Sequence, residues 1–273
     1  MKICHDDETG YRRDSQMCQS DIDTLQRTAR SWGLTLNQDK CAIIRFMRKY
    51  HIVPPPQYHI NQTMIQVVHT HPDLGVLIDS DIKFHQHIIA TAHKAGGLAQ
   101  NLLKATVCRS PEFLMSIFAT HIRPIIEYCS CVWNTGYVGD LRVLEAVQRR
   151  WTKQVANLGN LTYGARLRAL DQFSVQGRLL RADMIHCWKI FHDKCSICPT
   201  DLFVLAPQSA TRGHRYKVSH IRAQTDLRQR SFSARCVQTW NSLPEQVVSE
   251  KNVSAFKSKL AKALGDALFD YPP

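Results

Sequence analysis

The sequence lacks long apolar runs, and it lacks the features of an exported protein. No segment approaches the roughly 20 consecutive apolar residues that a membrane-spanning helix requires. Residues 1–6 do not contain the apolar centre of a signal peptide. We therefore expect an intracellular protein, nuclear or cytoplasmic, that is not secreted and has no membrane partner. Because these compartments are reducing, the 10 cysteines are expected to be free thiols.

Acidic residues are also scarce. The 273 residues include 23 aspartates and glutamates against 35 lysines and arginines, a formal net charge of +12, and the excess is spread along the chain. A folded protein this basic favours a polyanionic partner, with nucleic acid first and an acidic membrane surface second. Neither a glycine-rich phosphate loop nor a G-x-S-x-G elbow is present, so the sequence indicates neither of these two kinds of active site.

Hydrophobic residues make up 44% of the chain, which is enough for a folded protein with a substantial core. In residues 1–82 the apolar period predicts one helix, over about 15–32, that ends at Gly33. Its apolar stripe consists of Cys18, Ile22, Leu25, Ala29 and Trp32. Short extended segments follow, and Asn61-Gln62 between two of them predicts a tight turn. We expect one helix and a small antiparallel sheet here.

From Phe84 onward the apolar period becomes helical, and Ser110-Pro111 predicts the cap and first residue of a new helix. Further helices are predicted from Ser174, around 232–240 and around 253–268, whereas 205–230 is typical of loops or short strands. The predicted fold class is α+β, mainly α: a small sheet with one helix, then a helical bundle, then a mixed and looser C-terminal region.

The most strongly patterned segment is the predicted helix 140–153. Its apolar face recurs at helical spacing and consists of Leu141, Leu144, Val147, Trp151 and Val155. We expect Asp140 to be the N-cap. The opposite, solvated face should carry Arg142, Glu145, Arg149 and Lys153, with Arg150 at its border. Such a basic face either contacts a polyanion or is simply hydrated, and Glu145 could pair with Arg149 four residues on.

Seven short motifs follow one another along the chain: LNQDKCAIIRF, DLGVLIDSDIKFHQHI, HIRPIIEYCSCVWN, LEAVQRRWTK, LTYGARLRAL, TRGHRYKV, and WNSLPEQVV followed by NVSAFKSKL. Their order and spacing resemble the C-terminal part of the reverse transcriptase of a jockey-like non-LTR retrotransposon. The resemblance covers nearly the whole chain. It implies that residues 1–82 are a palm remnant, 83–170 a helical thumb-like domain and 171–273 a C-terminal helical extension.

The resemblance also implies catalytic residues. CHDDETGYRR looks like the acidic hairpin of the family, so Asp6 would bind Mg²⁺ with Asp7 as its neighbour, although Cys4 and His5 depart from the family pattern. Lys40 would lie near the departing phosphate. A polymerase site holds two metal ions and needs a further aspartate from an earlier strand. We therefore expect a truncated, inactive fragment, with Mg²⁺ bound only in a complete polymerase site.

The thumb-like segment implies RNA or RNA–DNA duplex as the partner, because backbone grip requires lysine and arginine on helices. The candidates are Arg149, Arg150 and Lys153, followed by Arg142, Lys104 and Arg109. Two alternatives stay open: an active polymerase part that needs fingers and palm from another chain, and a helical protein-interaction module without a nucleic-acid role.

Two cysteines raise the alternative of a metal site. Cys195 and Cys198 form a C-x-x-C, with His186, Cys187 and His192 upstream. One C-x-x-C with two histidines on its N-terminal side is not the spacing of common zinc sites. Free thiols are therefore favoured over zinc.

Overall fold

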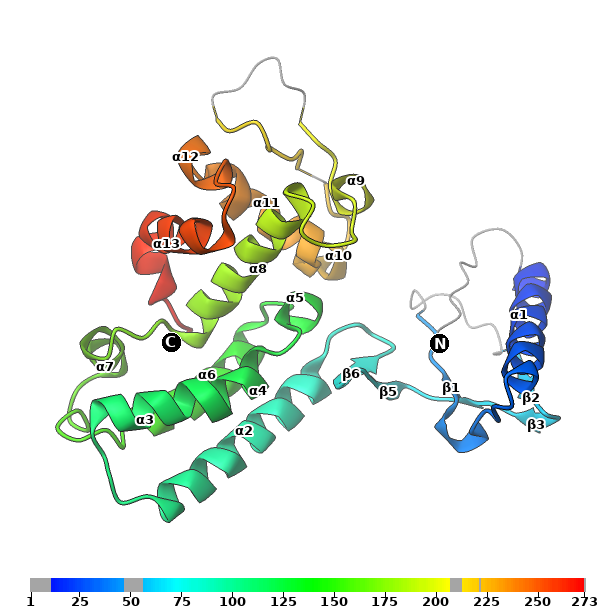
Figure 1. Cartoon of the computed structure of the whole chain (residues 1–273), viewed down its shortest axis with the longest axis horizontal. Coiled ribbons are helices and arrows are strands. Elements are labelled where there is room, and N and C mark those ends of the chain that lie inside the picture. The colour runs from blue at the N-terminus through cyan, green and yellow to red at the C-terminus, as the bar shows by residue number, and fades with distance from the viewer. Residues whose placement is uncertain (1–10, 47–55, 207–212, 221, 273) are drawn as a thin grey trace. The chain divides into compact units, whose positions relative to one another are not determined.

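The computed structural model of the protein describes residues 11–46, 56–206, 213–220 and 222–272. The chain divides into two compact units, Met1–Ile82 and Lys83–Pro273. Helices dominate and the sheets are small and two-stranded, so the predicted α+β, mainly α class is confirmed (Figure 1). None of the helices formed by the described residues is long and apolar enough to cross a membrane.

The first unit begins with helix α1 (Tyr11–Ser31), as the apolar period predicts. The helix ends in a Schellman arrangement, in which Gly33 N–H donates to the Arg30 carbonyl and Leu34 N–H to the Ala29 carbonyl. Gly33 adopts φ +70°, a conformation that glycine reaches without a Cβ clash. Trp32 does not belong to the buried stripe as predicted, because its side chain is 74% exposed.

Within the described residues of the first unit, the strands form three separate pairs rather than one antiparallel sheet. Their bounds are β1 (Ala42–Ile43), β2 (His59–Ile60), β3 (Thr63–Met64), β4 (Gln66–Val67), β5 (Thr70–Asp73) and β6 (Val76–Asp79), and the short helix η1 (Gln38–Lys40) precedes them. Pairs β2–β3 and β5–β6 are antiparallel, whereas β1–β4 is parallel. The predicted turn is confirmed: Asn61 and Gln62 join β2 to β3, both with positive φ, as in a type I′ turn.

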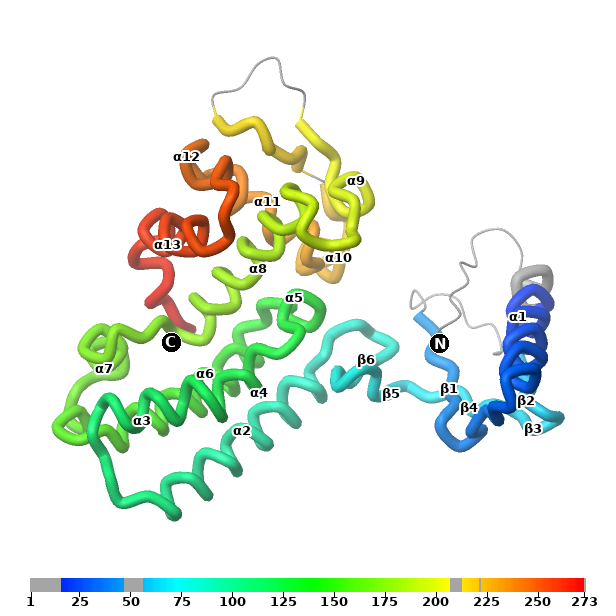
Figure 2. The backbone as a smooth tube through the Cα atoms, viewed as in Figure 1, coloured from blue at the N-terminus to red at the C-terminus, as the bar shows by residue number. Residues whose placement is uncertain are grey.

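The second unit consists of helices. Their bounds are α2 (His85–Ala105), α3 (Pro111–Ile117), the π-helical turn η2 (Phe118–Ile122), α4 (Arg123–Glu127), α5 (Ser130–Trp133), α6 (Val138–Thr152), α7 (Tyr163–Ala169), α8 (Val175–Phe191), α9 (Pro199–Leu202), α10 (Asp226–Arg230), α11 (Phe232–Ser242), α12 (Glu245–Val248), α13 (Val253–Leu264) and η3 (Gly265–Leu268). The tube in Figure 2 shows α2 and α6 side by side, and α8 between them and the C-terminal helices.

Two proline-containing segments behave as their chemistry dictates. Ser110 caps α3, its hydroxyl accepting from Phe113 N–H, and Pro111 is the first helical residue, as predicted. Farther along, Pro124 has no N–H to give to the preceding turn. The missing hydrogen bond falls where the chain forms the wide π-helical turn η2, and the α-helical pattern begins again as α4, with Pro124 in its first turn.

The C-terminal helices share a continuous aromatic core. Phe191 stacks on Trp240 with ring centroids 5.2 Å apart, and Trp188 stacks on Phe256 at 5.4 Å. Trp188 and Trp240 donate their ring N–H to the backbone carbonyls of Glu250 and Tyr216. These large side chains are therefore buried without an unpaired donor.

A buried ion pair connects this core to the preceding helices. Arg235 on α11 donates from Nε and Nη2 to the two carboxylate oxygens of Asp183 on α8, both at 2.9 Å. The same Nη2 donates to the carbonyl of Cys131 at 3.0 Å. Burial raises the pKa of Asp183, and the Arg235 guanidinium opposes that rise. The pair fixes α11 against both α8 and α5.

Candidate nucleic-acid interface

Helix α6 has the predicted apolar face, since Leu141, Leu144, Val147 and Trp151 are all buried. Val155 is buried too, but it lies in the turn after the helix ends at Thr152. The start of α6 differs from the prediction. Tyr137 is the N-cap, and Asp140 lies inside the first turn. The Asp140 carboxylate accepts from His85 Nδ1 at 2.6 Å, which joins the beginnings of α6 and α2. A carboxylate in this turn still complements the positive end of the helix dipole.

One flank of α6, beside its apolar face, is buried rather than solvated, which the sequence pattern did not predict for Glu145. Glu145, Gln148 and Thr152 are each 1% exposed, because α7 and α8 cover this side of the helix. Glu145 therefore does not form the surface pair with Arg149 that its spacing permits. Basic side chains remain exposed only at Arg142 and at the end of the helix, Arg149 and Arg150, followed by Lys153.

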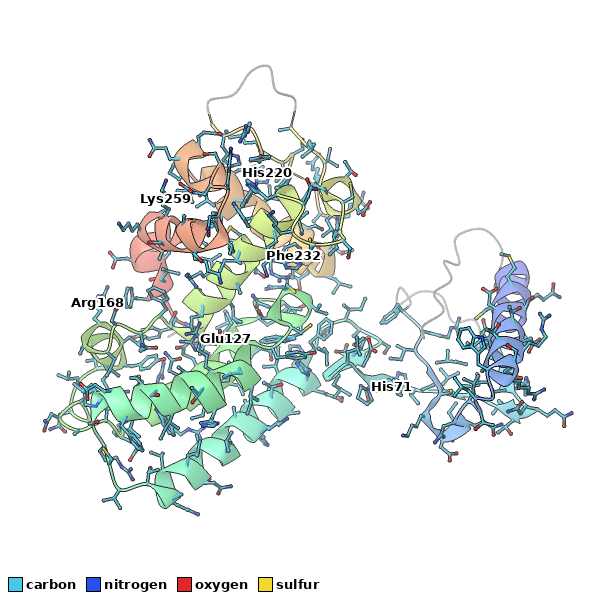
Figure 3. The ribbon with its side chains drawn as sticks, in the orientation of Figure 1. His71, Glu127, Arg168, His220, Phe232 and Lys259 are labelled. Carbon is cyan, nitrogen blue, oxygen red and sulfur yellow. The ribbon has the colours of Figure 1, made fainter. Side chains whose placement is uncertain are left out.

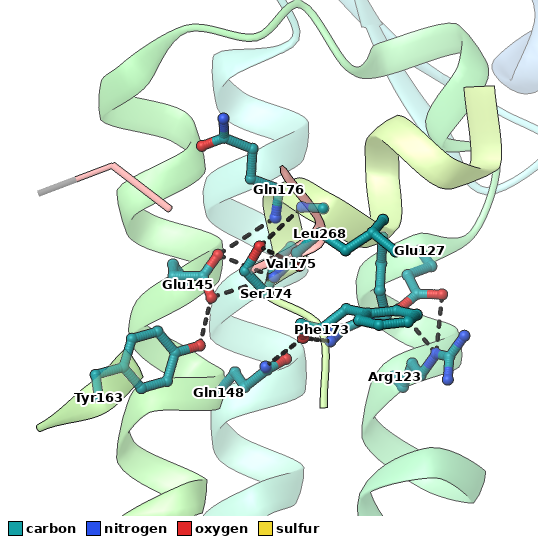
Figure 4. A network of polar contacts seen from close by, with 12 residues as sticks. Arg123, Glu127, Glu145, Gln148, Tyr163, Phe173, Ser174, Val175, Gln176 and Leu268 are labelled. Atoms are coloured by element: carbon teal, nitrogen blue, oxygen red, sulfur yellow. Dashed lines mark hydrogen bonds and ion pairs between the residues drawn. The ribbon is translucent and has the colours of Figure 1, made fainter. Parts of the chain in front are cut away.

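Glu145 is the centre of a buried polar network (Figure 4). Its carboxylate accepts from the Tyr163 hydroxyl, from Val175 N–H at 3.0 and 3.1 Å, and from Gln176 N–H at 3.3 Å. The two backbone donors belong to the first turn of α8, where N–H groups have no partner within the helix. Glu145 therefore caps a helix 30 residues away in sequence. Burial raises the pKa of Glu145, and the hydrogen bonds from Tyr163 and Val175 only partly offset this rise.

Arg166 closes the end of α6, although the sequence pattern does not mark it as a functional residue. The guanidinium donates to Thr152 Oγ1 at 3.2 Å, to the Leu161 carbonyl at 2.6 Å and to the Arg149 carbonyl at 3.3 Å. The Thr152 and Arg149 groups lie at the negative end of the α6 dipole, where a cation is favoured, whereas the Leu161 carbonyl lies just before α7. A buried arginine in LTYGARLRAL could be recognised from sequence only by knowing that α7 packs on α6.

Arg149 lies beside aromatic rings. Its guanidinium carbon is 5.1 Å from the centroid of Tyr163 and 5.7 Å from that of Tyr271, and these two rings pack edge to face. Such contacts hold a guanidinium in place while it remains accessible to an anion. The Arg149 guanidinium is therefore exposed to solvent while the two tyrosine rings restrict its orientation.

Helices α2 and α6 run in the same direction. Their beginnings meet at His85 and Asp140, and beyond their ends Ala156 N–H donates to the Arg109 carbonyl at 2.9 Å. Lys104 in the last turn of α2 is thus brought to the same end of the unit as Arg149, Arg150 and Lys153 (Figure 1). Cations here also stabilise the two helix C-termini, by about 0.3–1 kcal/mol each.

The remaining candidates have other surroundings. Arg109 donates to the carbonyls of Leu103, Thr106 and Cys108 at 2.8–3.2 Å, so its guanidinium caps the end of α2. Arg142 is exposed farther up α6.

The residues assigned to catalysis are in the first unit. Asp6 and Asp7 lie outside the described residues. Lys40 ends η1 with an exposed side chain, in a turn fixed by Asn37, whose side chain accepts from Asp39 N–H at 3.0 Å. Within the described ranges, no three His, Cys, Asp or Glu side chains come together in a way that could hold a metal ion.

The cysteines and histidines of the zinc alternative have individual partners. His192 stacks on Trp188 and contacts the Val248 carbonyl at 2.8 Å through Nε2. Cys187 is buried in the core, and Cys198 contacts the Thr200 hydroxyl. The nine cysteines that the structure describes are all free thiols.

The sequence is 31% identical to the RNA-directed DNA polymerase from mobile element jockey of Drosophila funebris over 135 residues (47% of this chain). That similarity relates the chain to retrotransposon reverse transcriptases. The match covers 14% of the length of the polymerase. No protein-family model matches the chain, and no solved structure matches it.

Proposed function

We propose that residues 83–170 act as the thumb-like part of a reverse transcriptase and grip the backbone of RNA or of an RNA–DNA duplex. The observation that carries the proposal is the exposed cationic end of the parallel helices α2 and α6. Arg149, Arg150 and Lys153 extend from this end, with Lys104 beside them, while the rest of α6 is largely buried. The similarity to a jockey polymerase supplies the class of partner.

Backbone recognition fits this chemistry. Lysine and arginine neutralise phosphates whatever the base sequence, and their binding weakens as salt rises because counterions are released. Arg150 and Lys153 have exposed side chains with no ion pair among the described residues. We propose that these two and Arg149 make the principal phosphate contacts, with Arg142 and Lys104 at the margin. Arg109 is a weaker candidate because its guanidinium caps α2.

A second part of the proposal concerns polymerisation. Two metal ions require more carboxylates than Asp6 and Asp7. We propose that the 273-residue chain by itself binds nucleic acid without extending a primer, and that Asp6, Asp7 and Lys40 act only in a complete site with Mg²⁺. Primer extension by the chain alone, lost in D6A, would contradict this part.

The binding part is tested by filter binding of a labelled RNA–DNA duplex at low salt. The variant R150Q/K153Q should bind at least about tenfold more weakly, since two phosphate contacts are lost. The matched control K251Q/K262Q removes the same charge from exposed lysines elsewhere in the second unit and should bind within about twofold. Equal affinities of the two variants would favour a protein-interaction module or a structural role for the α6 cations.

A further inference from the structure

A second cationic feature of the second unit lies away from the end of α6. A pocket of about 340 Å³ is formed by α4, the turn that follows it, the start of α5, α8 and α13. Its lining is dominated by basic side chains and contains a single carboxylate, that of Glu127, which is labelled in Figure 3. The basic residues are Arg123, Arg178, Arg181, His186, Lys189 and Lys257.

The charges of this pocket do not balance. Glu127 accepts from Arg123 Nε at 2.9 and 3.0 Å and also pairs with Arg178. That carboxylate is the only one among the lining residues, so Arg181, Lys189 and Lys257 have no carboxylate of their own there. Burial and the neighbouring Arg123 guanidinium lower the pKa of Arg181. The pocket is therefore a site of positive potential.

Two donors in the pocket lining are also unsatisfied. The Arg178 side chain is 3% exposed, and its Nη2 has no hydrogen-bond partner among the described residues. The Nε of Arg181 is likewise buried without a described partner. Folded proteins seldom leave buried charged donors unpaired, because each costs the free energy of its lost hydration. Both side chains line the pocket, but these two nitrogen atoms are themselves shielded from solvent, so they add buried positive charge beside the pocket rather than accessible donors.

We propose that this pocket binds a phosphate group, either as free phosphate or as the terminal phosphomonoester of a nucleotide. A tetrahedral dianion offers several acceptor oxygens to the converging arginines and lysines, and guanidinium groups match its geometry. The pocket volume lies near the lower end of the range for small-molecule sites, about 300–1,000 Å³. A double helix cannot enter such a space, so the site is separate from the duplex contacts proposed for α6.

The test is isothermal titration calorimetry of the full chain at constant ionic strength in a phosphate-free buffer. Inorganic phosphate, adenosine 5′-monophosphate and adenosine are titrated separately. Phosphate or the monophosphate should bind with one site per chain, and adenosine should not. Tighter binding of the monophosphate than of inorganic phosphate assigns the site to a nucleotide, and the reverse assigns it to free phosphate. No binding of either anion, or equal binding of adenosine, overturns the proposal.

Matched variants locate the binding. K189Q/K257Q removes two pocket cations from α8 and α13 and should weaken phosphate binding about tenfold or more, the loss expected for charge-assisted hydrogen bonds. K194Q/K262Q removes two exposed lysines from the ends of the same two helices and should bind as the wild type does. Circular dichroism melts show whether both variants fold. Equal losses in the two folded variants would place the anion elsewhere, and R150Q/K153Q should leave phosphate binding unchanged.

Discussion

Replacing Glu145 by alanine should destabilise the second unit more than any change on its surface. The substitution leaves three donors without their acceptor: the Tyr163 hydroxyl and the N–H groups of Val175 and Gln176. The first two are buried, and a buried donor without a partner costs about 1–3 kcal/mol. Removing the carboxylate also removes the free-energy cost of burying it, which offsets part of this effect. We therefore expect the free energy of unfolding to fall by about 2–4 kcal/mol.

Urea unfolding followed by circular dichroism measures this loss. The exposed Glu112, in the first turn of α3, provides a control, and E112A should change the free energy of unfolding by less than about 0.5 kcal/mol. Y163F alone should cost about 1 kcal/mol. In the E145A background the same change should be neutral or stabilising, because the hydroxyl has already lost its acceptor. If E145A remains within about 1 kcal/mol of the wild type, Glu145 is not the cap of α8 described above.

The dependence on pH gives this prediction a sign. Burial raises the pKa of Glu145, so the folded state holds this proton more tightly than the unfolded chain does. Proton binding by Glu145 therefore adds to the free energy of unfolding. This contribution is complete below the pKa of Glu145 in the unfolded chain and is lost as pH rises through its higher pKa in the folded state. The difference between wild type and E145A should therefore narrow as pH rises from about 4 to 7. A difference that widens over this range would show that the folded pKa is depressed.

The remaining predictions concern single contacts. R235L should lower the free energy of unfolding by about 3–5 kcal/mol in a urea titration, because Asp183 is left buried and unpaired; a loss below 1 kcal/mol would make the pair dispensable. R109Q should lower stability by about 1 kcal/mol through the lost cap of α2 while leaving duplex affinity within about twofold, and a large loss of affinity would return Arg109 to the interface. Q62G should stabilise the first unit by about 0.5–1 kcal/mol in a melting experiment, since φ is +67° at this position, and destabilisation would argue against the type I′ turn.

Local chemistry allowed much of the fold to be predicted. The start of α3 follows from Ser110-Pro111, and the end of α1 follows from Gly33, because caps and stops depend on neighbours within a few residues. The turn at Asn61-Gln62 was predicted for the same reason. The parallel β1–β4 pair was not, since strands of two residues carry no signal of direction.

The buried polar contacts of α6 could not be predicted from the sequence. The apolar face of α6 could be predicted from its spacing, yet Glu145 was assigned to a solvated face. Periodicity distinguishes apolar from polar positions but does not show that a second and a third helix cover the polar side. The roles of Glu145 and Arg166 depend on α7 and α8, which lie 18 to 30 residues from Glu145 in sequence. The phosphate pocket likewise depends on side chains from α4, α8 and α13 that only the fold brings together.

The salt dependence of duplex binding tests the central claim most directly. Fluorescence anisotropy of a labelled RNA–DNA duplex is measured at several salt concentrations for the wild type, R150Q/K153Q and the matched control K194Q/K262Q. Each phosphate contact contributes about 0.9 to the slope of log K against log salt, so R150Q/K153Q should reduce the magnitude of this slope by about 2. The control should retain the wild-type slope. Identical slopes in all three proteins, or wild-type affinity that does not change with salt, would contradict backbone binding at the end of α6.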